Sequence, residues 1–238
     1  TTMSIQAAIN AAASGKSVTV GDGTFAENIV ANKPIVLNGA NAGVVCGSRT
    51  NETVISPASG IPVSITSNGV TINGFEITTA SSVSRAIVSS GISDLVITYN
   101  NIHDVGSAVS GENVYGLIYS LGSATATNVT VNYNCFNNIG NYNNHQKSNG
   151  AIGFLDSNAS GTLSTLKIEN NSISNVFAKT ADWITLGGRI AYGIQINVGG
   201  SSSFLTTGKV VSASIKNNNI SNLTGFIATG IALEGNTE

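Results

Sequence analysis

The sequence has very few charged residues. Only 9% of its 238 residues are Asp, Glu, Lys or Arg, and the formal net charge is -2. A chain without a basic face cannot hold phosphate backbones, which excludes nucleic acid as a partner. No apolar run of about 18 residues occurs, so no membrane-spanning helix is predicted. No basic-then-apolar leader precedes Thr1, so we expect a mature secreted chain or an excised piece of a longer one.

A short phrase of alternating apolar and polar residues recurs five times along the chain. Its copies occupy residues 70–77, 95–102, 129–136, 166–173 and 213–220, and they align on Ile72, Ile97, Val131, Ile168 and Ile215. Every copy has an apolar residue five positions after this anchor. Such self-similarity predicts a solenoid, in which each repeat is one rung and buries its apolar face against its neighbours.

Each rung is expected to contain three short strands. The alternation in Val129-Thr130-Val131 has the period of a strand with one buried face. An Asn-type turn and a second apolar strand follow. A closing strand completes each rung, at residues 86–88, 116–118, 151–154, 193–196 and 230–233. Three strands per rung, all wound in one direction, predict an all-β, single-stranded parallel β-helix.

Two columns of Asn-type residues are expected to form ladders at the turns of this helix. The first column, three positions after the anchor, is Asn100, Asn134, Asn171 and Asn218, and the second, seven positions after it, is Asp104, Asn138, Asn175 and Asn222. Side chains stacked about 4.8 Å apart can bond both to the next rung and to the turn backbone. Both columns are therefore predicted to be buried with their hydrogen bonds satisfied.

These rungs resemble the right-handed β-helices of the pectin-lyase-like superfamily. Residues 5–9 (Ile-Gln-Ala-Ala-Ile), 18–28 (Val-Thr-Val-Gly-Asp-Gly-Thr-Phe-Ala-Glu-Asn) and 34–39 (Pro-Ile-Val-Leu-Asn-Gly) are similar to the start of many secreted members. Residues 39–43, with Arg49 and Glu52 after them, resemble segments of large secreted bacterial surface proteins. The resemblance implies the fold and an extracellular or cell-surface location. It implies no single activity, because the superfamily includes lyases, hydrolases, esterases and non-catalytic surface proteins.

The chain is expected to fold as one β-helix domain. The domain covers residues 1–238, with a capping helix within residues 1–16 and rungs over residues 17–238. Ile5 and Ile9 fall at helical spacing, and Ser4 can cap the helix start. A helix laid across a solenoid end covers its core and its strand edges. No such plug follows Leu233, so we expect the chain to be a fragment of a longer protein.

The two cysteines carry no metal or redox motif, because neither has a Cys-x-x-Cys spacing or a nearby His. Cys46 precedes the repeats, whereas Cys135 lies two or more rungs further on. At about 4.8 Å per rung, their Cα atoms should be farther apart than the roughly 7 Å limit for a disulfide. We therefore predict two free thiols and no metal site.

The loops between the second and the closing strands hold most of the chemistry, including both histidines and the only tryptophan. The candidate ligand-binding residues, which we call the loop wall, are His103, Asp104, Tyr142, His145, Lys147, Asp182, Trp183 and Arg189. Glycan sites combine an aromatic ring with amide, carboxylate and guanidinium groups. The loop wall is thus predicted to contact a glycan. The alternative is that these loops are solvated and that Trp183 only covers the core.

Catalysis is not expected. No rung face carries neighbouring acidic residues at matching offsets, and the paired-Asp, Gly-His-Gly and Arg-rich motifs of related enzymes are absent. We expect a non-catalytic adhesin or rigid spacer without cofactors, whose partners are a polysaccharide or cell-surface glycan and further domains of its parent protein. The alternative is a polysaccharide lyase or glycoside hydrolase. In that case His145, Lys147 and Arg189 would be the catalytic candidates, and a lyase could also use calcium.

Overall fold

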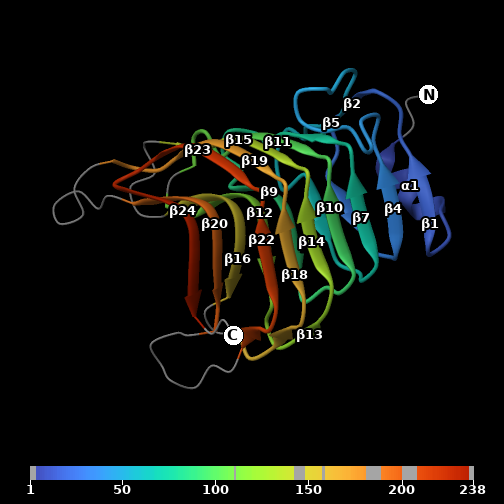
Figure 1. Ribbon diagram of the computed structural model, residues 1–238. Coiled ribbons are helices and arrows are strands. Elements are labelled where there is room, and N and C mark those ends of the chain that lie inside the picture. Colours follow the sequence, from blue (N-terminus) through green and yellow to red (C-terminus); the bar gives the residue numbers. More distant parts are fainter. Residues whose placement is uncertain are drawn as a thin grey trace.

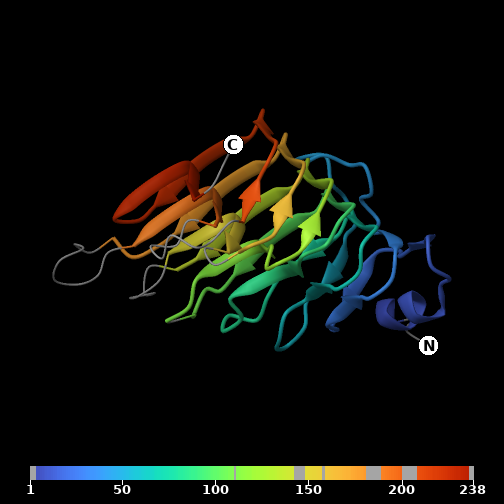
Figure 2. The same ribbon diagram turned by 90° about the horizontal axis from the view of Figure 1, so that it is seen from below.

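The chain forms a parallel β-helix with a short helix at its N-terminal end (Figures 1 and 2). The computed structural model describes residues 4–109, 111–141, 148–156, 159–180, 189–199 and 208–235. Over these residues, helix α1 (Ile5–Ala11) is followed by three 7-stranded parallel sheets and one 3-stranded sheet. The fold class predicted from the repeats is therefore confirmed.

The three large sheets take one strand each from every rung. The first sheet contains β1 (Lys16–Thr19), β4 (Ile35–Asn38), β7 (Val70–Asn73), β10 (Leu95–Thr98), β14 (Val129–Asn132), β18 (Leu166–Glu169) and β22 (Ala213–Lys216). The second contains β2 (Gly23–Phe25), β5 (Thr53–Ile55), β8 (Glu76–Ile77), β11 (Asn101–Val105), β15 (Cys135–Gly140), β19 (Ser172–Phe177) and β23 (Asn219–Thr224). The third contains β3 (Ile29–Ala31), β6 (Val63–Ile65), β9 (Arg85–Ser90), β12 (Val114–Ser120), β16 (Asn149–Asp156), β20 (Ile190–Val198) and β24 (Ile227–Gly235). We number the rungs 1 to 7 by the strands of the first sheet.

A fourth, small sheet lies in the loops between the closing strands and the next rung. It contains β13 (Thr125–Ala126), β17 (Thr162–Leu163) and β21 (Lys209–Val210). Its strands have two residues each, which is too short for an apolar alternation to be recognised in the sequence.

The anchors of the five repeats stack in register. Ile72 pairs with Ile97, Ile97 with Val131, Val131 with Ile168, and Ile168 with Ile215. The first four are fully buried, whereas Ile215 in rung 7 is half-buried, because no described rung lies beyond it. The core is therefore a column of stacked apolar side chains, and each rung depends on its neighbours for burial.

The first Asn column is a continuous hydrogen-bonded ladder at the turn between the first and second sheets, as predicted. Asn134 Oδ1 accepts from the backbone N of Asn100 at 3.0 Å and from Asn100 Nδ2 at 3.1 Å, while Asn134 Nδ2 donates to the carbonyl of Ile97 at 2.8 Å. Asn171 and Asn218 repeat the pattern. Asn100, Asn134 and Asn171 are at most 1% exposed, so these bonds satisfy amides that water cannot reach.

The second Asn column is not a buried ladder, and that prediction is wrong. Asp104, Asn138, Asn175 and Asn222 all have left-handed φ values between 50° and 57°, and all are half-buried or exposed. Asn and Asp tolerate this backbone conformation better than other non-glycine residues. Asn and Asp are favoured both in left-handed turns and in hydrogen-bonded ladders, so residue type alone does not distinguish the two.

Helix α1 covers the first rung, as predicted, with Ile5 and Ile9 buried against the core. Ser4 is its N-cap and accepts from the backbone N of Ala7 at 3.3 Å. The Glu27 carboxylate also accepts from the backbone N of Ile5 at 2.6 Å. A carboxylate is favourable at a helix N-terminus, because the first N–H groups have no intrahelical partner.

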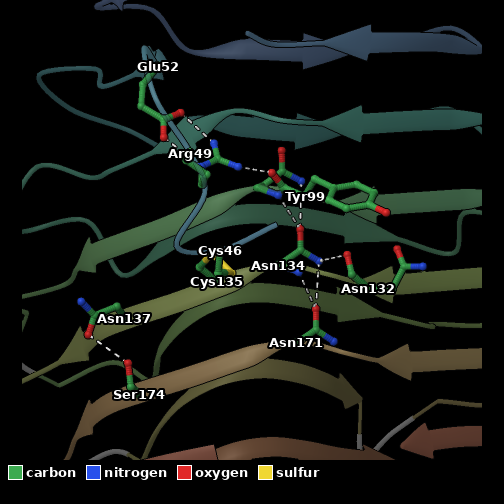
Figure 3. Close-up of a disulfide and its surroundings, with 11 residues drawn as sticks. Cys46, Arg49, Glu52, Tyr99, Asn132, Asn134, Cys135, Asn137, Asn171 and Ser174 are labelled. Atoms are coloured by element: carbon green, nitrogen blue, oxygen red, sulfur yellow. Dashed lines mark hydrogen bonds and ion pairs between the residues drawn. A yellow bond between two sulfur atoms is a disulfide. The ribbon is translucent and has the colours of Figure 1, made fainter. Parts of the chain in front are cut away.

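Cys46 and Cys135 form a disulfide, so the prediction of two free thiols is wrong. Their Cα atoms are 5.9 Å apart at a sequence separation of 89 residues (Figure 3). The prediction assumed that Cys46 stays in its own rung. Instead, residues 39–52 leave rung 2 between β4 and β5, cross the outside of rungs 3 and 4, and reach β15 in rung 5. We call residues 39–52 the strap.

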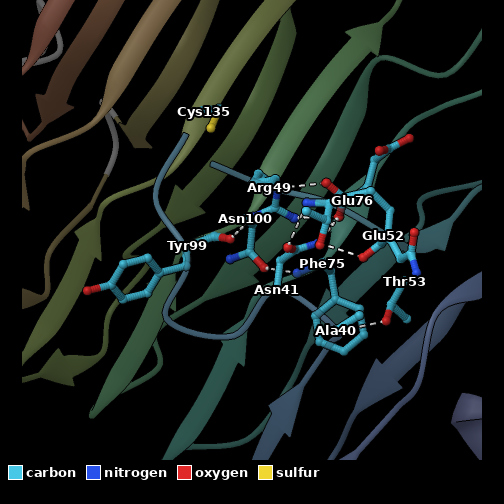
Figure 4. Close-up of polar contacts among 12 residues, drawn as sticks. Ala40, Asn41, Arg49, Glu52, Thr53, Phe75, Glu76, Tyr99, Asn100 and Cys135 are labelled. Carbon is cyan, nitrogen blue, oxygen red and sulfur yellow. Dashed lines mark hydrogen bonds and ion pairs between the residues drawn. The ribbon is translucent and has the colours of Figure 1, made fainter. Parts of the chain in front are cut away.

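An ion pair holds the strap in shape (Figure 4). Arg49 Nε donates to Glu52 Oε1 at 2.8 Å, and Arg49 Nη2 lies 2.7 Å from Glu52 Oε2. Arg49 Nη1 also donates to the carbonyl oxygen of Tyr99 in rung 4. Gly74, at φ 79°, lies beneath the strap, and a Cβ there would collide with the backbone of Asn41 and Ala42. The strap is thus packed directly on the turn of rung 3.

Asn171→Leu should lower the free energy of unfolding by about 1–3 kcal/mol, because it leaves the backbone N of Asn134 and the carbonyl of Val131 buried without partners. The urea midpoint measures this loss. Asn219→Leu is the control, since Asn219 is exposed. Equal midpoints for the two variants would contradict the ladder's contribution to stability.

Reducing the disulfide should destabilise the fold by about 2–4 kcal/mol, because the bond restricts a long loop of the unfolded chain. Urea midpoints with and without dithiothreitol measure the effect. The double variant Cys46→Ser/Cys135→Ser should start at the lower midpoint and be insensitive to reductant. Detection of two titratable thiols in the unreduced native protein would reject the pairing.

Candidate functional site

The structure describes three of the eight loop-wall residues: His103, Asp104 and Arg189. Tyr142, His145, Lys147, Asp182 and Trp183 lie outside the described residues. His103 and Asp104 are neighbours in β11 of rung 4, whereas Arg189 precedes β20 in rung 6. Two rungs separate them, so these three residues do not form one cluster.

His103 lies between two carboxylates. Its Nδ1 is 2.7 Å from Asp104 Oδ2, and its Nε2 is 3.3 Å from Glu76 Oε1. Burial alone would raise the pKa of Asp104, but hydrogen bonds from Asn138 and His103, together with the charge of His103, lower it below 3.8. Within the described ranges, no group of three or more His, Cys, Asp or Glu side chains could hold a metal ion.

Two clefts lie on the outer face of the third sheet. One of them, which we call the amide cleft, has a volume of about 410 Å³. Its polar lining residues are Asn113, Tyr115, Ser148, Asp156, Gln195 and Asn197, from rungs 4 to 6. Asn113 directly precedes β12, and Ser148 directly precedes β16. The amide cleft therefore begins at the start of these closing strands and is built mainly by the third sheet.

Two glycines make room for the ring of Tyr115, which lines this cleft. Tyr115 of β12 pairs in register with Gly150 of β16, and its ring lies across Gly150 and Gly153. A Cβ at Gly153 would come within 2.8 Å of the ring, and a Cβ at Gly150 would collide with it. The outer face of rung 5 thus lacks side chains where Tyr115 lies, and the ring is buried.

A network of side chains fixes the polar groups of the amide cleft. The Tyr115 hydroxyl donates to Gln195 Oε1, and Gln195 Nε2 donates to Glu234 Oε2 at 2.9 Å. Asn197 Nδ2 donates to the same carboxylate oxygen at 3.0 Å. Burial raises the pKa of Tyr115, with smaller contributions from Tyr192 and Glu234, so its phenol remains a donor at neutral pH. The orientation of both amides is therefore defined before any ligand arrives.

A second cleft of about 410 Å³ lies on the same face in rungs 2 to 4. Its polar lining includes Ser64, Arg85, Ser90 and Ser120. Arg85 pairs in register with Tyr115, and its buried Nε has no hydrogen-bond partner among the described residues. The two clefts follow each other along the solenoid axis on one sheet face. We call them together the outer groove.

The sequence analysis predicts the closing strands that form the outer groove, but it does not predict a binding site on them. Its residues occupy the outward positions of the closing strands, where Gln195 and Asn197 alternate with buried Ile194 and Ile196. The sequence feature that could have indicated this site is the pair of glycines in one closing strand, Gly150 and Gly153. Glycines in a strand leave space on the face of the sheet.

Comparison with protein-family models, with curated proteins and with solved structures found no match to this chain. Within the described ranges, no helix has the length and apolar character needed to cross a membrane.

The acid sensitivity of the fold should depend partly on Asp104. Because its pKa is lowered in the folded state, its ionised form stabilises the protein above the unfolded value of 3.8, and this contribution is lost as pH falls through the folded pKa. Asp104→Asn keeps a residue that fits the left-handed turn. The variant should be less stable than wild type at about pH 6 and equally stable at about pH 2 in urea titrations. A pH-independent difference would contradict the charge effect.

Proposed function

We propose that this chain is a non-catalytic β-helix module of a secreted or surface protein, an adhesin or rigid spacer, that binds a glycan in the outer groove. The observation that carries the proposal is the amide cleft, in which Gln195 and Asn197 are held in defined orientations by Tyr115 and Glu234. The proposed contact surface is therefore the third sheet rather than the loop wall.

The chemistry of the amide cleft suits sugar hydroxyls. Each hydroxyl can donate and accept a hydrogen bond, and the amides of Asn113 and Asn197 offer both functions, as does the hydroxyl of Ser148. Groups oriented in advance lose little entropy when a ligand binds. A volume of about 410 Å³ lies within the usual range of small-molecule sites.

The Cys46–Cys135 disulfide supports an extracellular location, because such bonds persist in oxidising compartments and are rare in the cytosol. The stacked sheets support the spacer role, since a solenoid with bonds between all neighbouring rungs is an extended, stiff element. The further domains of a parent protein are its expected covalent neighbours.

Membership of the pectin-lyase-like superfamily is part of the proposal. Three parallel sheets and an Asn ladder at the turn between the first and second sheets support it. Fold likeness alone leaves the activity open.

A polysaccharide lyase or glycoside hydrolase is the second candidate. It is favoured by Asp156, which lines the amide cleft, and by Glu234, which is bonded to its lining residues Gln195 and Asn197. Both already accept hydrogen bonds from the protein: Asp156 from the backbone N of Gly122, and Glu234 from Gln195 and Asn197. Incubation with uronic-acid polymers tests the lyase directly, since cleavage creates a new ultraviolet absorbance. Release of reducing ends from neutral polymers tests the hydrolase. Either signal would replace the binding proposal.

Asn197→Ala should weaken retention on a glycan array by about tenfold, because it removes an oriented amide worth roughly 1–1.5 kcal/mol. Asn38→Ala, on the outer face of the first sheet, removes a comparable amide hydrogen bond and should leave retention unchanged. Thermal unfolding verifies that both variants fold. Retention that is equal in wild type and Asn197→Ala would reject the amide cleft as the site.

A further inference from the structure

Two tyrosines occupy strained positions on the turn between the first and second sheets. Tyr99 and Tyr133 immediately precede the ladder residues Asn100 and Asn134, with φ values of 54° and 56°. Other rungs have residues that tolerate this conformation at the same position: Gly74, Asn170 and Asn217. A bulky side chain is uncommon in the left-handed region and is disfavoured there. Rungs 4 and 5 therefore carry aromatic rings where the backbone favours Gly or Asn.

The two rings form a stacked pair on the outside of the turn. Their centroids are 5.0 Å apart with an interplanar angle of 3°, and both side chains are half-buried. The ring of Tyr99 comes from rung 4 and that of Tyr133 from rung 5, so the second face of Tyr133 is turned toward rung 6. Stacking offsets part of the backbone strain, and it holds the ring of Tyr133 in a fixed orientation.

A cleft of about 240 Å³ borders Tyr133 on this side. Its other principal lining residues are Val45, Cys46, Asn170, Asn217 and Asn219, and none of the described residues that line it is charged. Val45 belongs to the strap and is 46% exposed. The cleft thus combines an aromatic ring, an aliphatic side chain and several amides, without a charge.

A second cleft of about 340 Å³ adjoins the first across the disulfide, since Cys46 and Ser172 line both. The Arg49–Glu52 ion pair (Figures 3 and 4) lines it. Asn101 and Asn137 of the second sheet also line it. The side-chain amide of Asn101 has no hydrogen-bond partner in the described part of the chain. We call the two clefts together the strap trough.

We propose that the strap trough is a binding site for a neutral saccharide. The ring of Tyr133 stacks on the C–H face of one sugar, and the amides of Asn170, Asn217 and Asn219 bind its hydroxyls. The amide of Asn101 contacts the adjoining sugar across the Cys46–Cys135 bridge. The ligand is expected to be neutral, because the described residues of the cleft beside Tyr133 include no group that would pair with an acidic or a basic sugar. The trough lies outside the turn and the second sheet, so it does not rest on the outer groove of the third sheet.

The variant Tyr133→Asn tests the proposal without a folding penalty, because Asn already occupies this turn position in rungs 6 and 7. Isothermal titration with neutral gluco-, manno-, galacto- and xylo-oligosaccharides gives the affinity of wild type and variants. For at least one of these probes, Tyr133→Asn should bind about tenfold or more weakly than wild type, with a melting temperature equal to or above it. Tyr133→Phe should retain the affinity, since it keeps the ring.

Two further measurements separate this site from the outer groove. Asn197→Ala should leave the Tyr133-dependent affinity unchanged, and uronate oligosaccharides should not bind at the trough. The proposal is overturned if wild type binds none of the neutral probes, or if Tyr133→Asn binds them all as tightly as wild type. It is also overturned if Asn197→Ala abolishes the binding that Tyr133→Asn weakens, because one site on the third sheet would then account for both effects.

Discussion

The Asn ladder at the turn between the first and second sheets is the interaction on which the other features depend. Each buried amide accepts from the backbone of the preceding rung and donates to a carbonyl there, as Asn134 does with Asn100 and Ile97. A slip of one residue between rungs would leave these groups unpaired in the core, at a cost of about 1–3 kcal/mol each. The ladder therefore fixes the register of the sheets and the left-handed backbone of the residue before each Asn.

A fixed register gives every outward column of side chains a defined position, and the candidate sites follow from this. Tyr115 can lie flat on rung 5 only because Gly150 and Gly153 are held beneath it. Tyr99 and Tyr133 stack because the ladder places their turns one above the other. The strap also depends on the position of these turns, since Arg49 donates a hydrogen bond to the backbone carbonyl of Tyr99. Binding surfaces on this fold are thus consequences of the alignment between rungs.

The sequence predicts what is local and periodic. The anchors, the ladder and the capping helix were all found, because their spacing is set by strand period, turn chemistry and helix period. The sequence does not predict the disulfide, because the distance between Cys46 and Cys135 depends on the path of the strap. The strap leaves rung 2, and no periodic pattern in its sequence indicates where it goes. The sequence does not predict the amide cleft for a related reason. Gly150 makes room for the ring of Tyr115, and the sequence does not show that these two residues, 35 positions apart, are neighbours.

Hydrogen exchange of side-chain amides tests the ladder most directly. Exchange of a buried, bonded amide requires local or global opening, so the Nδ2 protons of Asn100, Asn134 and Asn171 should exchange at least about a hundredfold more slowly than those of a solvent-facing Asn. Asn219, which is exposed, provides that reference within the same protein. Nuclear magnetic resonance in deuterated water resolves the two groups. Fast exchange of the three ladder amides in the folded protein would contradict the account.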